Sequence, residues 1–223
     1  KEITPIVASE TQKNNVQIGK LEDELKTFIQ EMRKRDFYKY ECGRENALAK
    51  LEGVYAEVAA YEQKTQDFGF TAKKFDNPNL IDGCNKHIDS IKVELGNMKM
   101  LWDHISHCQQ IFSGYLNASW AETQPFEMED DVKKNMKTLK DMKVDKRANA
   151  YGGILDEIKK WLIFLPLIAE LADPAMRDRH WDAIRTKVGK QFTVDDKLQL
   201  QDIYNLNLQD YKEDVEEITD QAK

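Results

Sequence analysis

Apolar residues in the first third of the chain recur at alternating steps of three and four positions. The first series is Ile18, Leu21, Leu25, Phe28 and Met32, with charged residues between its members. This spacing predicts a helix that packs along one face, as in a coiled-coil seam. The series fails over 33–44 and resumes as Leu48, Leu51, Tyr55 and Val58. A continuous helix over 17–67 would be about 75 Å long, whereas a break at Gly43 would give two helices.

A second apolar series is longer and unbroken. It comprises Ile81, Cys84, Ile88, Ile91, Leu95, Met98, Trp102 and Ile105, and Phe112 and Tyr115 follow after a gap. Asn79 or Asp82, just after Pro78, is a suitable cap for the start of this helix. Its length of about 50 Å exceeds the diameter of roughly 45 Å expected for a compact globule of this size. The two series therefore predict an elongated molecule.

The rest of the chain predicts shorter elements. Residues 117–125 have the composition of a loop, and the next helix has one apolar face, formed by Met128, Val132, Met136 and Leu139. A helix over 151–172 contains Pro166, which we expect to kink it. Asp173 and Pro174 suit the N-cap and first position of a helix that ends near Gly189. Short helical pieces follow from 193 and from 208. The predicted fold class is all-α: an elongated bundle of long helices with short connecting helices.

Composition narrows the class of protein. The 223 residues include 33 Lys and Arg against 40 Asp and Glu, for a net charge of -7, and only 10 Gly and 5 Pro. So few turn formers disfavour an all-β fold, and no apolar run approaches the 18 or so residues of a membrane span. The acidic balance disfavours nucleic-acid binding. Three scattered cysteines, Cys42, Cys84 and Cys108, fit reduced thiols of a cytosolic protein. The first residue is Lys and not Met, and the last helical pattern stops before it is complete. We therefore expect the sequence to be a segment of a longer protein.

Motifs for catalysis are missing from the sequence. It contains no Gly-x-x-x-x-Gly-Lys-Ser/Thr, no Gly-x-Gly-x-x-Gly and no Gly-x-Ser-x-Gly, so we expect no enzyme activity in this segment. Cys84 and His87 on one side, and His104, His107 and Cys108 on the other, have spacings that suit zinc. Twenty helical residues, about 30 Å, separate Cys84 from His104. We therefore expect no metal site, and expect the two cysteines to pack in the interior.

Two segments carry candidate interaction residues. The basic and aromatic stretch 33–40 is either a docking patch for a partner or a solvated face with two of its aromatic residues packed into the helical bundle. In the second segment, Trp181, Ile184 and Val188 share one helical face. Arg179 and His180 flank Trp181 with donors suited to carbonyls or carboxylates of a neighbouring element. No nucleophile accompanies His180, so we interpret this segment as a structural anchor between helices.

Residues 173–184, Asp-Pro-Ala-Met-Arg-Asp-Arg-His-Trp-Asp-Ala-Ile, resemble the Arg-His-Trp segment in the N-terminal part of the dynein heavy-chain linker. The resemblance includes Leu101-Trp102, the loop around Trp120, the segments 165–171 and 198–208, and the final helix. It is specific from about Pro78 onward and weaker over the first 75 residues. It implies that 1–77 is the end of the tail, a long helical segment, and that 78–223 is the N-terminal part of the linker domain. The residues of this segment are more similar to those of axonemal, outer-arm heavy chains than to those of cytoplasmic ones.

The resemblance implies a mechanical role in a microtubule motor. In dyneins the linker crosses the face of the AAA+ ring, bends and straightens with the ATP cycle, and passes force to the tail. ATP and Mg belong to the ring of the parent protein, so no cofactor is implied in this segment. The implied partners are the AAA+ ring of the same heavy chain and other heavy, intermediate or light chains on the tail side, with no nucleic acid and no membrane. The implied location is the cytoplasm and cytoskeleton, in the axoneme of a cilium or flagellum.

The family supplies no catalytic residue for these positions, and Arg179, His180 and Trp181 transfer only as structural anchors. Hinges are expected where the apolar series fail, and the candidate positions are Gly43, Pro78, Pro125, Gly152 and Gly153. Two other classes remain as alternatives. A spectrin-like scaffold that binds partner helices would show a repeat of bundle-sized units, and none is visible. A metal-dependent helical enzyme is disfavoured by the spacing of its ligands.

Overall fold

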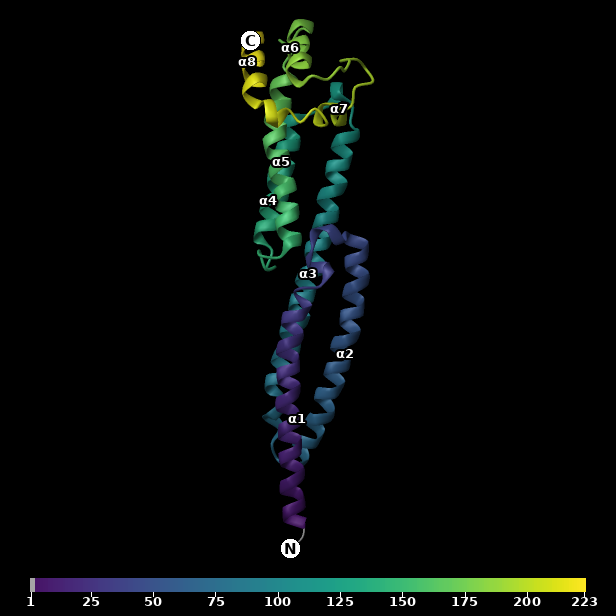
Figure 1. Ribbon diagram of the computed structural model, residues 1–223, viewed down its shortest axis with the longest axis vertical. Coiled ribbons are helices and arrows are strands. Elements are labelled where there is room, and N and C mark those ends of the chain that lie inside the picture. The colour runs from purple at the N-terminus through teal and green to yellow at the C-terminus, as the bar shows by residue number, and fades with distance from the viewer. Residues whose placement is uncertain (1–2) are drawn as a thin grey trace. The chain divides into compact units, whose positions relative to one another are not determined.

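The computed structural model describes residues 3–223, and its regular structure is helical (Figure 1). The long helices are α1 (Ile3–Met32), α2 (Arg44–Lys74), α3 (Asp82–Asn117) and α5 (Asn149–Leu171). The shorter ones are α4 (Pro125–Asp141), α6 (Asp178–Val188), α7 (Leu200–Tyr204) and α8 (Lys212–Ala222). One-turn 3-10 helices connect them: η1 (Asp36–Tyr38), η2 (Tyr40–Cys42), η3 (Pro78–Ile81), η4 (Trp120–Glu122) and η5 (Leu208–Tyr211). The predicted all-α class is confirmed.

The chain forms two compact units that share two helices. Unit 1 comprises the residues up to Asp103 together with Lys143–Gly152, and unit 2 comprises His104–Met142 and Gly153–Lys223. The boundary crosses α3 after Asp103 and α5 after Gly152. These units are defined by packing, whereas the predicted division at 77–78 separates a tail from a linker. That division stays a prediction.

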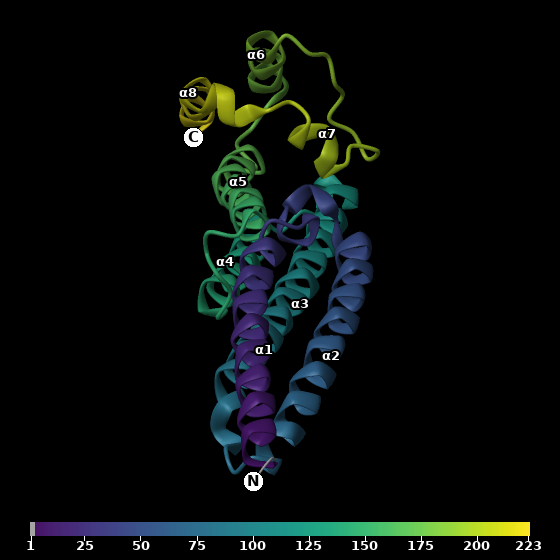
Figure 2. The ribbon, with the colours of Figure 1, turned by 60° about the horizontal axis from the view of Figure 1, so that its bottom comes forward.

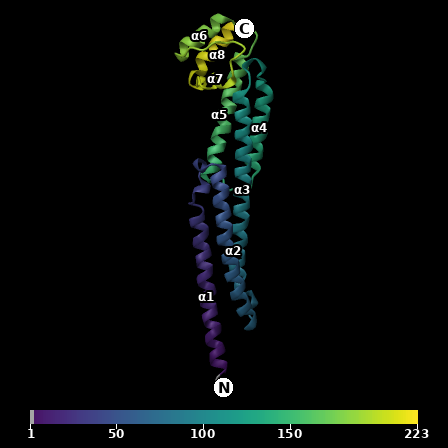
Figure 3. The same ribbon diagram turned by 90° about the vertical axis from the view of Figure 1, so that its right-hand side faces the viewer.

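Unit 1 is built on three long helices, α1, α2 and the first part of α3, which lie side by side (Figures 2 and 3). The apolar series of α1 and α3 face this core. The members of the two series that are buried in unit 1 are Ile18, Leu21, Leu25, Phe28 and Met32 of α1, and Cys84, Ile88, Ile91, Leu95, Met98 and Trp102 of α3. Ile105, in unit 2, is buried as well, whereas Ile81 lies in η3 and is only half-buried. The predicted seams of both helices are therefore confirmed. At 30 and 31 residues, α1 and α2 are each about 45 Å long.

The predicted seam of α2 is wrong in part. Leu51 and Val58 are buried, but Tyr55 is 39% exposed. The seam uses Ala47 and Val54 in place of Leu48 and Tyr55, which keeps the same alternation of steps with smaller side chains. The break at 33–44 divides the segment into two helices, as one of the two alternatives predicted. Gly43 precedes α2 with a φ of 74°, a conformation that glycine adopts without strain.

Unit 2 packs the last part of α3 against α4 and the greater part of α5, with α6, α7 and α8 following. The predicted apolar face of α4 is largely confirmed, because Met128, Val132 and Leu139 are buried. Pro166 lies inside α5, which continues past it to Leu171. No helix within residues 3–223 has an apolar stretch long enough to cross a membrane.

The predicted start of α6 is wrong, whereas its end is right. Asp173 accepts a hydrogen bond from the backbone N–H of Ala175 (2.8 Å), so it closes a turn and does not cap a helix. The helix begins four residues after Pro174, at Asp178, with Arg177 at the N-cap. It ends at Val188, and Gly189 follows in the left-handed conformation of a C-cap.

Candidate functional site

Residues 33–43, between α1 and α2, form a polar joint with α3 in unit 1. After Met32 the chain turns through η1 and η2, and both aromatic residues of η1 are buried, Phe37 at 0% and Tyr38 at 5% exposure. The indole N–H of Trp102 on α3 donates to the carbonyl of Phe37 (2.8 Å) in the interior. A buried backbone acceptor needs such a donor, so this bond ties the turn to α3.

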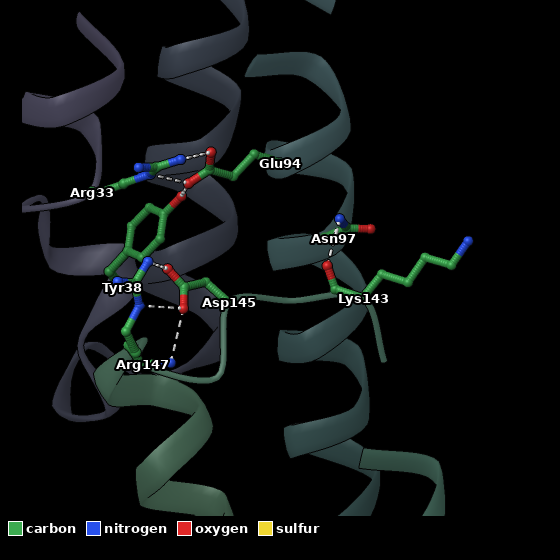
Figure 4. Close-up of polar contacts among 7 residues, drawn as sticks. All are labelled: Arg33, Tyr38, Glu94, Asn97, Lys143, Asp145 and Arg147. Atoms are coloured by element: carbon green, nitrogen blue, oxygen red, sulfur yellow. Dashed lines mark hydrogen bonds and ion pairs between the residues drawn. The ribbon is translucent and has the colours of Figure 1, made fainter. Parts of the chain in front are cut away.

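Glu94 of α3 is the centre of this joint (Figure 4). It accepts two hydrogen bonds from the Arg33 guanidinium, at 2.8 and 3.0 Å, and one from the Tyr38 hydroxyl at 2.5 Å. Paired charged bonds of this kind are the stronger ones in proteins. Burial of Tyr38 and its bond to the Glu94 carboxylate raise the pKa of the phenol well above its usual value of about 10.

The connector between α4 and α5 also belongs to this joint. The Asn97 side chain donates to the backbone carbonyl of Lys143 (3.0 Å), and the backbone N–H of Tyr40 donates to the side chain of Asn149 (2.9 Å). Asp145 is held by Arg147, whose hydrogen bonds keep the pKa of the carboxyl low (Figure 4). A hollow of about 350 Å³ lies between the connector, Arg33 and Glu94.

These contacts decide between the two interpretations of 33–40. Phe37 and Tyr38 are interior, and the Arg35 guanidinium forms two bonds to Glu57 of α2, at 2.7 and 2.8 Å. Arg33 and Arg35 therefore pair with carboxylates of α3 and α2, whereas Lys34 and Lys39 pair with Glu31 and Asp36, three residues earlier in the chain. The alternative of a solvated face with two buried aromatic residues is confirmed for Phe37 and Tyr38.

Unit 2 has a joint of a different kind, formed by the predicted anchor segment. Trp181, Ile184 and Val188 are buried on one face of α6, as predicted. The Trp181 ring packs edge-on against Trp120 and Phe192, with ring centroids 5.8 and 6.0 Å apart. The loop of Trp120 is held by backbone bonds from Trp120 N–H to Leu198 O (2.8 Å) and from Leu200 N–H to Ala118 O (3.0 Å).

Arg179 and His180 make local contacts in the structure. The Nδ1 atom of His180 accepts from the backbone N–H of Arg177 (3.0 Å), which satisfies the first turn of α6. The Arg179 Nε–H donates to the Nε2 atom of the same ring (3.1 Å). The predicted donation to a neighbouring element is thus replaced by a cap of their own helix.

Trp161 is the residue whose role sequence reasoning missed. It is 1% exposed on α5, and its ring lies between Phe112 and Tyr204, with near-parallel rings and centroids 5.1 Å away on each side. Phe164 and Tyr115 meet it edge-on. The sequence placed Trp161 on a helix, but its partners come from segments far apart in the chain. Only the spacing of Trp161 and Phe164, one turn apart, hinted at an aromatic cluster.

The two groups of cysteine and histidine residues considered as zinc ligands lie in different units, and Cys108 contacts His104 within the second group (3.5 Å). Cys84 lies against the backbone of Ile18 in unit 1, whereas His104 donates to the Asn135 carbonyl (3.0 Å) in unit 2. Burial raises the pKa of the Cys108 thiol to about 12 and lowers the pKa of His104. Cys84 and Cys108 are buried, as predicted. Among residues 3–223, no group of three potential ligands gathers at one point.

The five predicted hinge positions fall at three kinds of place. Gly43 precedes α2, Pro78 begins η3, and Pro125 is the buried first residue of α4. Gly152 and Gly153 lie within α5, on either side of the boundary between the two units. Bending at these positions stays a prediction.

The described residues form two helical units, each closed by the contacts given above. Residues 88–223 match the family described as "Dynein heavy chain, N-terminal region 2", which is more than half of the chain. The chain therefore belongs to the dynein heavy-chain family, and it is an N-terminal region of such a chain.

Relatives of known name extend the match. The chain is 27% identical over 224 residues to the "Dynein alpha chain, flagellar outer arm" of Chlamydomonas reinhardtii, covering 100% of this chain and 5% of that protein. It is 31% identical over 173 residues to the "Dynein beta chain, ciliary" of Heliocidaris crassispina, covering 77% of this chain and 4% of that protein. The "Dynein beta chain, flagellar outer arm" of Chlamydomonas reinhardtii is 34% identical over 131 residues, with 58% and 3% covered. The chain thus spans about one twentieth of the length of these relatives.

Proposed function

We propose that this chain is a force-transmitting segment at the junction of tail and linker in a dynein motor that acts on microtubules. In this role it couples ATP-driven changes in the AAA+ ring, which lies elsewhere in the parent chain, to the tail. The observation that carries the proposal is the match of 88–223 to an N-terminal region of dynein heavy chains. The names of the relatives support a place in the axoneme of a cilium or flagellum.

The construction of unit 1 supports a mechanical role. A segment that transmits force must resist bending, and three packed helices with continuous apolar seams do so. The interruption at 33–44 is closed by Glu94 with Arg33 and Tyr38, and by Trp102 with Phe37. The proposed partners are the ring of the same heavy chain and other dynein chains on the tail side.

The test breaks α3 in the parent heavy chain without removing a buried side chain. Met100 is 60% exposed on α3, so Met100→Pro removes a helix hydrogen bond and introduces a clash, while Met100→Ala is the matched control. We expect the Met100→Pro motor to keep its microtubule-stimulated ATPase and to drive microtubule gliding several times more slowly. The Met100→Ala motor should glide at the normal speed.

Equal gliding speeds of the two variants, with circular dichroism confirming a folded Met100→Pro segment, would contradict the proposal. A parallel loss of ATPase and gliding would also contradict it, because the defect would then lie in the chemistry of the ring and not in transmission.

A further inference from the structure

Helix α5 in unit 2 contains an unusually apolar stretch. Residues 161–169 of α5 read Trp-Leu-Ile-Phe-Leu-Pro-Leu-Ile-Ala, without a charged or hydrogen-bonding side chain apart from the indole. A helix that is apolar on all sides is normally buried on all sides. Trp161, Phe164, Leu165, Leu167 and Ile168 are buried, but Ile163 is 52% exposed and Pro166 is exposed as well. The described part of the chain leaves one face of α5 uncovered.

The uncovered face forms the floor of a groove. One hollow of about 430 Å³ lies between α5 and α8, and another of about 530 Å³ lies between α5 and the start of α4. Both hollows are lined by Pro166 and Glu170, so they form one surface, which we call the α5 groove. Phe126, 74% exposed at the start of α4, stands beside it. All of these residues belong to unit 2.

Charge at the α5 groove is predominantly negative. The carboxylates that line it are Glu129, Glu170, Asp173, Glu216 and Asp220. Three of these carboxylates are paired with a lysine: Glu216 with Lys212, Glu170 with Lys223, and Glu129 with Lys133. Asp173 and Asp220 carry the remaining excess of negative charge. A ligand that neutralises this excess must be basic.

We propose that the α5 groove binds an amphipathic helix of a partner polypeptide, with an apolar face over Ile163, Pro166 and Phe126 and with Lys or Arg on its flanks. The apolar strip on α5 repeats at helical spacing, which suits the ridge of a second helix. The basic flanks meet the carboxylates of α4, α5 and α8. This inference does not rest on the proposed motor role.

The direct test is binding of two synthetic helices to the 223-residue chain, measured by fluorescence anisotropy. Both peptides carry Leu along one face, and they differ only in having Lys or Glu on the flanks. We expect the Lys peptide to bind in the micromolar range and the Glu peptide to bind at least tenfold more weakly. Equal binding of the two peptides would overturn the proposal.

Variants localise the binding to the groove. Ile163→Asp places a charge on the floor at an exposed position and should weaken the Lys peptide at least tenfold. Phe70→Ala is the control, because Phe70 is also a large exposed apolar residue (65% exposed, against 52% for Ile163) but lies in unit 1 and does not line the groove. The double variant Glu216→Lys and Asp220→Lys should shift the preference toward the Glu peptide. An Ile163→Asp chain that binds as tightly as the wild type would refute the groove as the site.

The source of the partner helix is tested in the full-length heavy chain. A photo-crosslinking amino acid at position 163 should give an adduct with a second polypeptide through a basic helical segment. An adduct within the same heavy chain would overturn the assignment to a partner.

Discussion

The two units close their joints with opposite chemistry. In unit 1, the turn between α1 and α2 is held by a carboxylate, Glu94, which is shared by Arg33 and Tyr38. In unit 2, the loop after α3 and the helix α6 meet through the rings of Trp120 and Trp181. A polar joint depends on protonation and on the pairing of each buried group, whereas an aromatic joint depends on volume and contact area. The two joints should therefore fail under different perturbations.

The largest effect is expected from the aromatic joint. Trp181→Ala should lower the unfolding free energy of unit 2 by about 3–5 kcal/mol, because it removes a buried indole and leaves a cavity. Hydrogen exchange read by mass spectrometry would show the loss in unit 2. The matched variant Trp181→Phe keeps a ring against Trp120 and should cost about 1–2 kcal/mol. Exchange rates that stay unchanged in Trp181→Ala would show that α6 is not an anchor.

A polar effect of intermediate size is expected in unit 1. Trp102→Phe retains a ring in the core but removes the N–H that donates to the Phe37 carbonyl. An acceptor left buried without a donor costs about 1–3 kcal/mol. Chemical denaturation should therefore report a larger loss for Trp102→Phe than for Trp181→Phe. The reverse order would remove the contrast between a polar and an aromatic joint.

Alkaline pH separates the joints further. The pKa of Tyr38 in the folded chain lies above its ordinary value of about 10, because the phenol is buried and bonded to Glu94. Above pH 10 the unfolded chain loses this proton while the folded chain keeps it, so Tyr38 lowers stability by about 1.4 kcal/mol per pH unit. Below pH 10 this contribution is constant.

Tyr38→Phe tests this linkage. At pH 7 the variant should be less stable by about 1–2 kcal/mol, since Glu94 loses one donor. The difference from the wild type should shrink as pH rises above 10. Tyr115→Phe in unit 2 should show the same trend between pH 10 and 11, because burial raises the pKa of Tyr115 to about 12. A wild-type and a Tyr38→Phe curve that stay parallel from pH 7 to 11 would contradict the raised pKa.

Periodicity predicted much of this fold, because burial follows helical spacing wherever the apolar residues are unambiguous. It identified the cores of α1 and α3 and the buried face of α6. It failed at Tyr55, where two registers share Leu51 and Val58 and only packing selects the smaller Val54. It also failed at Asp173, whose side chain serves a turn as readily as a helix cap.

The joints were harder to predict than the helices. The aromatic residues of 33–40 were visible in the sequence, but Glu94, the partner of Tyr38, lies 56 residues away in the chain. The cluster around Trp161 likewise joins Phe112 to Tyr204. Such contacts depend on how helices from distant parts of the chain pack, and a single sequence gives no spacing rule for them.

The smallest effect is expected at the glycine pair on the boundary between the units. A Cβ at Gly152 would meet no atom within 4 Å, and the residue lies in α5. Gly152→Ala should therefore raise stability by about 0.5–1 kcal/mol, since alanine favours the helix. The same change at Gly43, whose φ is 74°, should lower stability by about 1 kcal/mol.

If α5 also bends at Gly152 during motor action, Gly152→Ala in the parent heavy chain should slow gliding despite the gain in stability. Unchanged gliding, with the stability gain confirmed by thermal denaturation, would remove Gly152 from the candidate hinges.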